Sequence, residues 1–79
     1  MTWRDHIHSN PETLGGKPVV RGTRLAVHFL LGLLAEGWTQ EQVLRNYPQL
    51  TPEGLRAVFA FASETLHDDT LYSVDSGAA

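Results

Sequence analysis

The cationic residues of the N-terminal third are the ones whose type and spacing could do chemistry. Lys17, Arg21 and Arg24 lie within the segment GGKPVVRGTR, among glycines and a short β-branched run. A guanidinium presents its donors in a planar fork that matches a carboxylate or a phosphate. An arginine pair beside a tight turn is therefore suited to bind an anionic partner. The alternative is an intramolecular role, in which the arginines bond turn carbonyls or a carboxylate of the helical part.

Other chemistries fit the sequence less well. A Walker-type phosphate loop needs Gly-Lys-Ser/Thr, but Gly16-Lys17 is followed by Pro18, which has neither an amide hydrogen nor a hydroxyl. His6 and His8 would share one strand face, yet the chain has no cysteine to complete a metal site, so we expect exposed strand histidines. The serines stand in polar or terminal contexts without a positioned base. We expect a protein without catalytic activity, metal or cofactor.

The chain size sets the organisation. Its 79 residues fit one domain, and a domain this small buries only ~60–65% of its unfolded surface, so self-association is expected. The N-terminus lacks the pattern of a signal peptide, and the apolar run 29–35 is too short to span a bilayer. These features, with the absence of cysteine, predict a soluble cytoplasmic protein that does not enter a membrane.

Charge is distributed unevenly along the chain. The net charge is −3, which argues against strong nucleic-acid binding by the chain as a whole. Residues 1–35 carry a net charge of +2 and residues 36–79 a net charge of −5. The asymmetry is typical of two faces with different partners, and ordinary solvation of a small domain would explain it equally well.

The cationic segment must be positioned by local β structure. Residues 5–9 are predicted to form a short strand, followed by a turn at 9–12 because Asn-Pro initiates turns. Residues 18–21 are predicted to form a second strand, so that the two make either a hairpin or edge strands that pair with another copy. The expected structural residues of the turns are Gly15, Gly16, Pro18 and Gly22.

Two helices are predicted next. The segment from Val27 to Ala35 is apolar nearly all round, which predicts a helix buried on most sides, and Gly37 is placed to end it. A second helix over 40–46 begins with a capping box, in which Thr39 caps the helix and Gln42 bonds back to the cap.

The third helix begins with Thr51 as its cap and Pro52 at its first position. Its expected buried stripe is Leu55, Val58, Phe59, Ala62 and Leu66, with a second, weaker one at Ala57, Phe61 and Thr65. The predicted fold is mainly α: a three-helix, helix-turn-helix-like core with a short N-terminal β-hairpin or strand pair. We expect one domain over residues 1–66 and an acidic C-terminal tail over residues 67–79.

One family shares these motifs in this order. The core Gly-Lys-Pro-x-x-x-Gly-Thr-Arg at 16–24, with Asn-Pro at 10–11, Tyr-Pro-x-Leu-Thr at 47–51 and Ala-Phe-Ala at 60–62, resembles the prokaryotic domain of unknown function numbered 433. That family includes VapB-type antitoxin-like proteins, and the resemblance covers roughly residues 5–66. It implies a helix-turn-helix fold without catalytic activity, acting as the antitoxin of a PIN-like ribonuclease toxin. By analogy it also implies a dimer that binds its own promoter.

Gly54 departs from the family pattern, in which an acidic or polar residue is more usual at this place. A glycine here weakens the start of the third helix by up to ~1 kcal/mol relative to alanine. It also removes a polar contact where a recognition helix would meet DNA.

Two surfaces are candidates for binding. The residues expected to contact DNA or a protein partner are Lys17, Arg21, Thr23, Arg24 and Arg56. The tail offers apolar anchors between carboxylates, as a segment that orders on a basic toxin would, and its anchors are Leu66, Leu71, Tyr72 and Val74. Two other functions remain open: a stand-alone DNA-binding transcriptional regulator and a structural homo-oligomerisation module.

Overall fold

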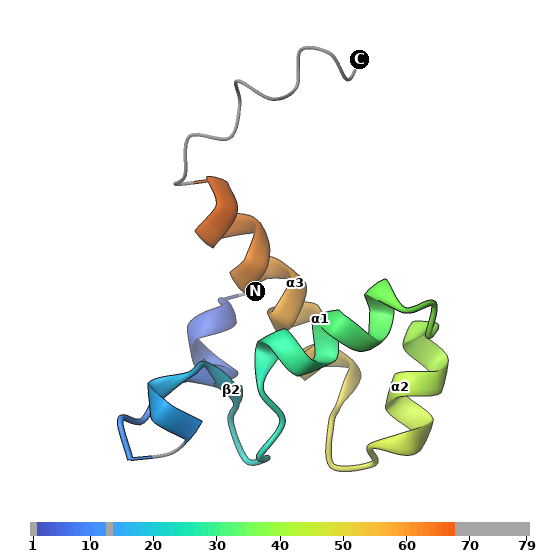
Figure 1. The fold of residues 1–79 in the computed structure, drawn as a ribbon, viewed down its shortest axis with the longest axis horizontal. Helices are drawn as coiled ribbons and strands as arrows, with labels where there is room; N and C mark the ends of the chain where they lie inside the picture. The colour runs from blue at the N-terminus through green and yellow to red at the C-terminus, as the bar shows by residue number, and fades with distance from the viewer. Residues whose placement is uncertain (1, 13, 68–79) are drawn as a thin grey trace.

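The computed structural model describes residues 2–12 and 14–67. The mainly helical fold predicted above is confirmed, with a two-stranded antiparallel sheet at the N-terminal side of three helices (Figure 1). The elements in chain order are the 3-10 helix η1 (Trp3–Asp5), β1 (Ile7–His8), the 3-10 turn η2 (Leu14–Gly16), β2 (Val19–Val20), α1 (Val27–Ala35), α2 (Gln40–Asn46) and α3 (Pro52–His67).

The strand pair forms within one chain. Ile7 pairs with Val20 and His8 with Val19, antiparallel. On the other side of β2, Val19 forms a further antiparallel bridge with Ala26. The tight hairpin therefore connects β2 to the start of α1, while the longer connection 9–18 joins β1 to β2. Within the turn predicted at 9–12, the Glu12 amide donates a hydrogen bond to Asn10 Oδ1 at 2.8 Å.

The helix ends follow the capping chemistry of the sequence. Thr39 Oγ1 accepts a hydrogen bond from the Gln42 amide at 3.0 Å, and Gln42 Oε1 accepts one from the Thr39 amide at 2.8 Å, so the predicted capping box is confirmed. Gly37 takes a φ of 106° just past α1. Thr51 Oγ1 accepts from the Gly54 amide at 2.9 Å and caps α3 as predicted.

The hydrophobic core joins all three helices to the sheet. Its fully buried residues, less than 2% exposed, include Leu30 of α1, Val43 of α2 and Leu55 of α3. The remaining members of the cluster are Ile7, Val20, Leu25, Val27, Leu50, Ala57 and Val58.

The burial predicted for two apolar helices is partly wrong. In α1 only Val27 and Leu30 are buried, and Phe29 is 40% exposed. In α3 Phe59 is 38% and Leu66 54% exposed, although both belonged to the predicted buried stripe. The reason is geometric: each helix contacts the rest of this small domain along one side only, so the apolar residues of its other side face water.

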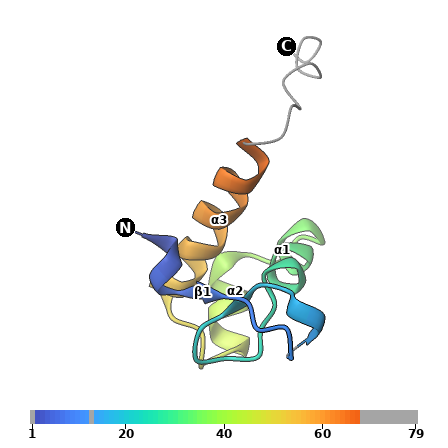
Figure 2. The same cartoon turned by 90° about the vertical axis from the view of Figure 1, so that its left-hand side faces the viewer.

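The helices are spread around α3 rather than bundled in parallel. In Figure 1, η1 and the strands lie at one side of the domain and α2 at the other, with α1 between them. In Figure 2, as in Figure 1, the C-terminal half of α3 extends beyond the other helices. The end of α3 is thus a projecting part of the domain.

Candidate partner-binding site

The hairpin 18–27 is a rigid platform built by backbone hydrogen bonds. The amide of Val20 donates to the Leu25 carbonyl at 2.9 Å, and the amide of Val27 donates to the Pro18 carbonyl at 2.9 Å. The amide of Arg21 donates to the His6 carbonyl at 2.7 Å and so ties the hairpin to β1. A segment bonded on both sides in this way fixes the backbone that carries the cations.

Thr23 and Gly22 close the turn of this hairpin. The Thr23 hydroxyl donates to the Val20 carbonyl at 2.8 Å and accepts from the Leu25 amide at 2.9 Å. Gly22 has a φ of 83°, a region that glycine adopts without steric cost. Thr23, expected above as a contact residue, therefore has its hydroxyl engaged inside the turn.

The hairpin arginines have no acceptor among the residues that the structure describes. Arg21 and Arg24 are exposed, and neither guanidinium has a hydrogen bond or ion pair with any residue that the structure describes. Lys17, just before β2, is exposed and unpaired within the same residues. The sequence left two roles open for these arginines, binding an anionic partner or bonding within the chain. No bond of the second kind is present among the described residues.

Arg56 lies on a different side of α3 from the hairpin. A β-carbon at residue 54 would lie 3.3 Å from Val20 Cγ1, so this side of α3 packs against β2. Arg56 follows two residues later, roughly 200° around the helix, and is exposed. It lines a small pocket of about 130 Å³ with Pro52 and Glu53, so a carboxylate accompanies the cation at the start of α3.

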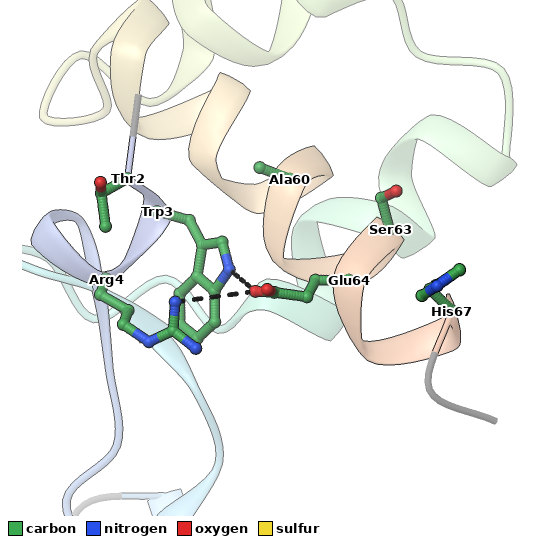
Figure 3. Close-up of a pocket in the computed structure, with 7 residues that line it drawn as sticks. All are labelled: Thr2, Trp3, Arg4, Ala60, Ser63, Glu64 and His67. Atoms are coloured by element: carbon green, nitrogen blue, oxygen red, sulfur yellow. Dashed lines mark hydrogen bonds and ion pairs between the residues drawn. The ribbon is translucent and has the colours of Figure 1, made fainter.

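A set of contacts between η1 and α3, called here the clasp, covers part of the α3 surface. Trp3 Nε1 donates a hydrogen bond to Glu64 Oε1, and Arg4 Nη1 lies 3.8 Å from the same oxygen (Figure 3). The Trp3 ring also meets Phe61 edge-on at 4.8 Å between centroids, while the Arg4 guanidinium stacks 4.4 Å from the Trp3 ring. Sequence reasoning missed this clasp, because no local pattern links residues so far apart.

The clasp borders an open pocket of about 470 Å³. Ala60, Ser63 and His67 of α3 complete its wall opposite Thr2 (Figure 3). η1 packs on α3 at Phe61 and Glu64, whereas Glu53 and Arg56 lie in the first two turns of the same helix.

A second, apolar groove lies between α1 and α3, and is called here the α1/α3 groove. Its volume is about 250 Å³. Its lining residues are Pro18, Val27, His28, Leu31, Phe61, Ala62, Thr65 and Leu66. Of the tail anchors, Leu66 is described and lies on this groove, while Leu71, Tyr72 and Val74 lie outside the described residues.

The described residues contain no group of three or more histidines, aspartates or glutamates placed to hold a metal ion. His8 lies in β1 and His6 in the turn just before it, and both are partly buried, so the expectation of two exposed strand histidines is wrong. Across the same residues, no helix has both the length and the apolar content to cross a bilayer.

Comparison with known proteins places this arrangement in one family. The sequence model of DUF433, described as "Protein of unknown function (DUF433)", matches residues 7–62. An uncharacterized protein, y4eO, of Sinorhizobium fredii is 39% identical over 59 residues, which are 75% of this chain and 27% of the relative. The crystal structure of a DUF433 member from Anabaena variabilis superposes with a TM-score of 0.76 at 30% identity, over 81% of this chain and 63% of that one.

The chain thus spans about a quarter of the curated relative it matches and under two thirds of the similar crystal structure. The matched region includes the hairpin, both strands, α1, α2 and most of α3. This chain belongs to the DUF433 family.

Proposed function

We propose that the protein is a non-enzymatic, antitoxin-like binding module that neutralises a PIN-like ribonuclease. The observation that carries the proposal is the pair of exposed guanidiniums, Arg21 and Arg24, without partners in the described chain. They stand on a hairpin whose backbone is bonded on both sides, so little backbone entropy is lost when they bind. The resemblance to antitoxin-like members of the family supplies the class of partner.

The chemistry of inhibition follows from the guanidinium. A PIN-like nuclease gathers carboxylates to hold its metal ions, and an arginine fork bonds such a carboxylate through two parallel hydrogen bonds. Arg21 or Arg24 would then compete with the metal for the same oxygens. Lys17 lies four residues before Arg21 and adds positive charge to the approaching surface.

Binding of promoter DNA is the second candidate function, favoured by the helix-turn-helix-like order of α2 and α3 and by exposed Arg56. Phosphate contacts make affinity fall linearly with the logarithm of salt concentration, by a slope near −0.9 for each contact. If this function holds, Arg56→Ala lowers the slope by about one per protomer. An absent gel shift at low salt would remove the candidate.

The competition with metal gives the direct test of ribonuclease neutralisation. A PIN-like nuclease that co-purifies with the chain is assayed on RNA with increasing protein, at several Mn²⁺ concentrations. The proposal predicts that the inhibition constant rises as Mn²⁺ rises, and that Arg21→Ala/Arg24→Ala weakens inhibition at least tenfold.

Arg45→Ala is the matched control, because Arg45 is an exposed arginine whose guanidinium bonds Glu41 of the same helix at 3.0 Å. It should inhibit as the natural chain does. Inhibition that is independent of Mn²⁺, or unchanged in the double variant, would exclude the arginine mechanism.

A further inference from the structure

The α1/α3 groove lies where the described chain ends. Leu66, one turn or less from the end of α3, forms part of its wall and is 54% exposed. Ala62 and Phe61 continue this wall along α3, and Leu31 faces them from α1. A half-exposed leucine beside an apolar groove leaves surface in water that burial would stabilise.

The size and lining of the groove fit side chains better than a small molecule. Its volume of about 250 Å³ is below the roughly 300–1,000 Å³ of typical ligand sites. Its lining side chains are mostly apolar and include no carboxylate, lysine or arginine. Such a groove takes one or two apolar anchors of a peptide segment.

The chain supplies such a segment directly after the groove. Residues 68–79 follow α3, and Leu71, Tyr72 and Val74 are their large apolar side chains. In an extended segment alternate side chains point to the same face. Tyr72 and Val74 would therefore enter the groove together, with Ser73 turned away.

The reach of the segment allows this contact within one molecule. The groove runs along α3 from Leu66 back to Phe61, roughly 7.5 Å at the helical rise per residue. Five residues of extended chain from His67 to Tyr72 span up to about 17 Å. The chain can therefore reverse direction after α3 and still place Tyr72 alongside Ala62.

The charges of residues 68–79 and of the groove rim also favour this segment as the occupant of the groove. Asp68 and Asp69 precede the apolar residues of the segment, and Asp75 follows them. Lys17 adjoins Pro18, a residue of the groove wall, and is exposed and unpaired within the described chain. An acidic segment in the groove would bring a carboxylate to this lysine.

We propose that Tyr72 and Val74 occupy the α1/α3 groove of their own domain. The C-terminal segment then acts as an internal strap, and any partner that binds these residues must first displace them. The contact involves the chain alone, so it holds whether or not the partner is a nuclease.

Paramagnetic broadening in the full chain tests the strap. The natural sequence has no cysteine, so Ser76→Cys accepts a single nitroxide label beyond Val74. The amide signals of Leu31 and Ala62 are expected to lose most of their intensity. The amide signal of Val43 in α2 is expected to keep its full intensity. Tyr72→Ser/Val74→Ser should restore the signals, and Ser73→Ala, on the opposite face, should leave the broadening unchanged.

A mixed sample separates this contact from one between molecules. Unlabelled ¹⁵N protein is combined with nitroxide-labelled ¹⁴N protein, and the strap predicts no broadening of the groove amides. Broadening in that sample would assign the groove to the tail of a second copy and overturn the proposal. Full groove signals in the labelled chain, or broadening that survives Tyr72→Ser/Val74→Ser, would overturn it as well.

Discussion

The backbone of Gly54 lies against Val20: a β-carbon at residue 54 would sit 3.3 Å from Val20 Cγ1, and equally close to side-chain atoms of Leu50 and Thr51. This contact brings the first turn of α3 onto β2. The glycine that interrupts the family pattern thus has a packing role, and a side chain at this buried position would face the core. The expectation that residue 54 faces DNA is therefore wrong.

Gly54→Ala should destabilise the protein although alanine is the better helix former. Helix propensity favours alanine by about 1 kcal/mol, but overpacking a core contact costs about 1–3 kcal/mol. Since Val20 and Leu50 are 4% and 3% exposed, they have little room to move, and the expected net loss is about 1 kcal/mol. Urea denaturation measures it.

Gly32→Ala is the matched control, because a β-carbon there meets nothing within 4 Å. It should stabilise the chain by about 0.5–1 kcal/mol. In a Val20→Ala background the penalty at Gly54 should shrink by at least about 0.5 kcal/mol. Equal stabilisation by both glycine replacements would show that the contact with Val20 is not tight.

Thr23→Val should destabilise the hairpin, because both hydrogen bonds of the hydroxyl are lost while the shape is kept. With about 0.5–1.5 kcal/mol for each bond, the expected loss in unfolding free energy is about 1–3 kcal/mol. Thr23→Ser keeps the hydroxyl and should stay within about 0.5 kcal/mol of the natural chain. If valine and serine gave the same urea midpoint, the turn would not depend on this hydroxyl.

Trp3→Ala should lower the unfolding free energy by about 2 kcal/mol, because the ring packs on Phe61 and its N–H bonds Glu64. Glu64→Ala should cost less than about 1 kcal/mol, since the ion pair with Arg4 is exposed to solvent. Thermal or urea unfolding of both variants gives the two decreases in unfolding free energy. Their ratio shows whether packing or charge contributes more to the contact between η1 and α3. A larger loss from Glu64→Ala would contradict this assignment.

Phe29→Ser should shift the chain toward the monomer. Phe29 is 40% exposed on a helix that is apolar nearly all round, and it meets Tyr47 edge-on at 5.8 Å. A small domain with such a face is expected to self-associate. Sedimentation velocity at micromolar concentrations should give an oligomer for the natural chain and a smaller species for the variant. A natural chain that sediments as a monomer would contradict the prediction.

Local chemistry in the sequence predicted most of the fold. The caps at Thr39 and Thr51 and the stop at Gly37 involve residues within one turn of each other, so short motifs specify them. The β-branched pair Val19–Val20 similarly marked its strand. These signals are short-range, which is why the helix bounds agree closely with the structure. The strand predicted over residues 5–9 is partly wrong, because Asp5 belongs to η1 and only Ile7–His8 pair with β2.

Contacts between distant residues were beyond such patterns. Trp3 and Glu64 meet only because η1 packs on α3, and Gly54 is required only because β2 passes close to it. The α1 pattern indicated burial, but it could not tell burial in one chain from burial against a second copy. For the arginines, residue type predicted binding chemistry, while only the structure determines whether an acceptor lies nearby.

The central claim, that Arg21 and Arg24 bind a nuclease, is tested most directly by quantitative capture from the native host at moderate salt. The natural chain, Arg21→Ala/Arg24→Ala and Arg45→Ala are tagged alike, and the bound proteins are quantified by mass spectrometry. We predict a PIN-like ribonuclease in fixed ratio with the natural chain and with Arg45→Ala, and its loss from the double variant. Equal recovery by all three chains, or capture of no nuclease by the natural chain, would contradict the claim.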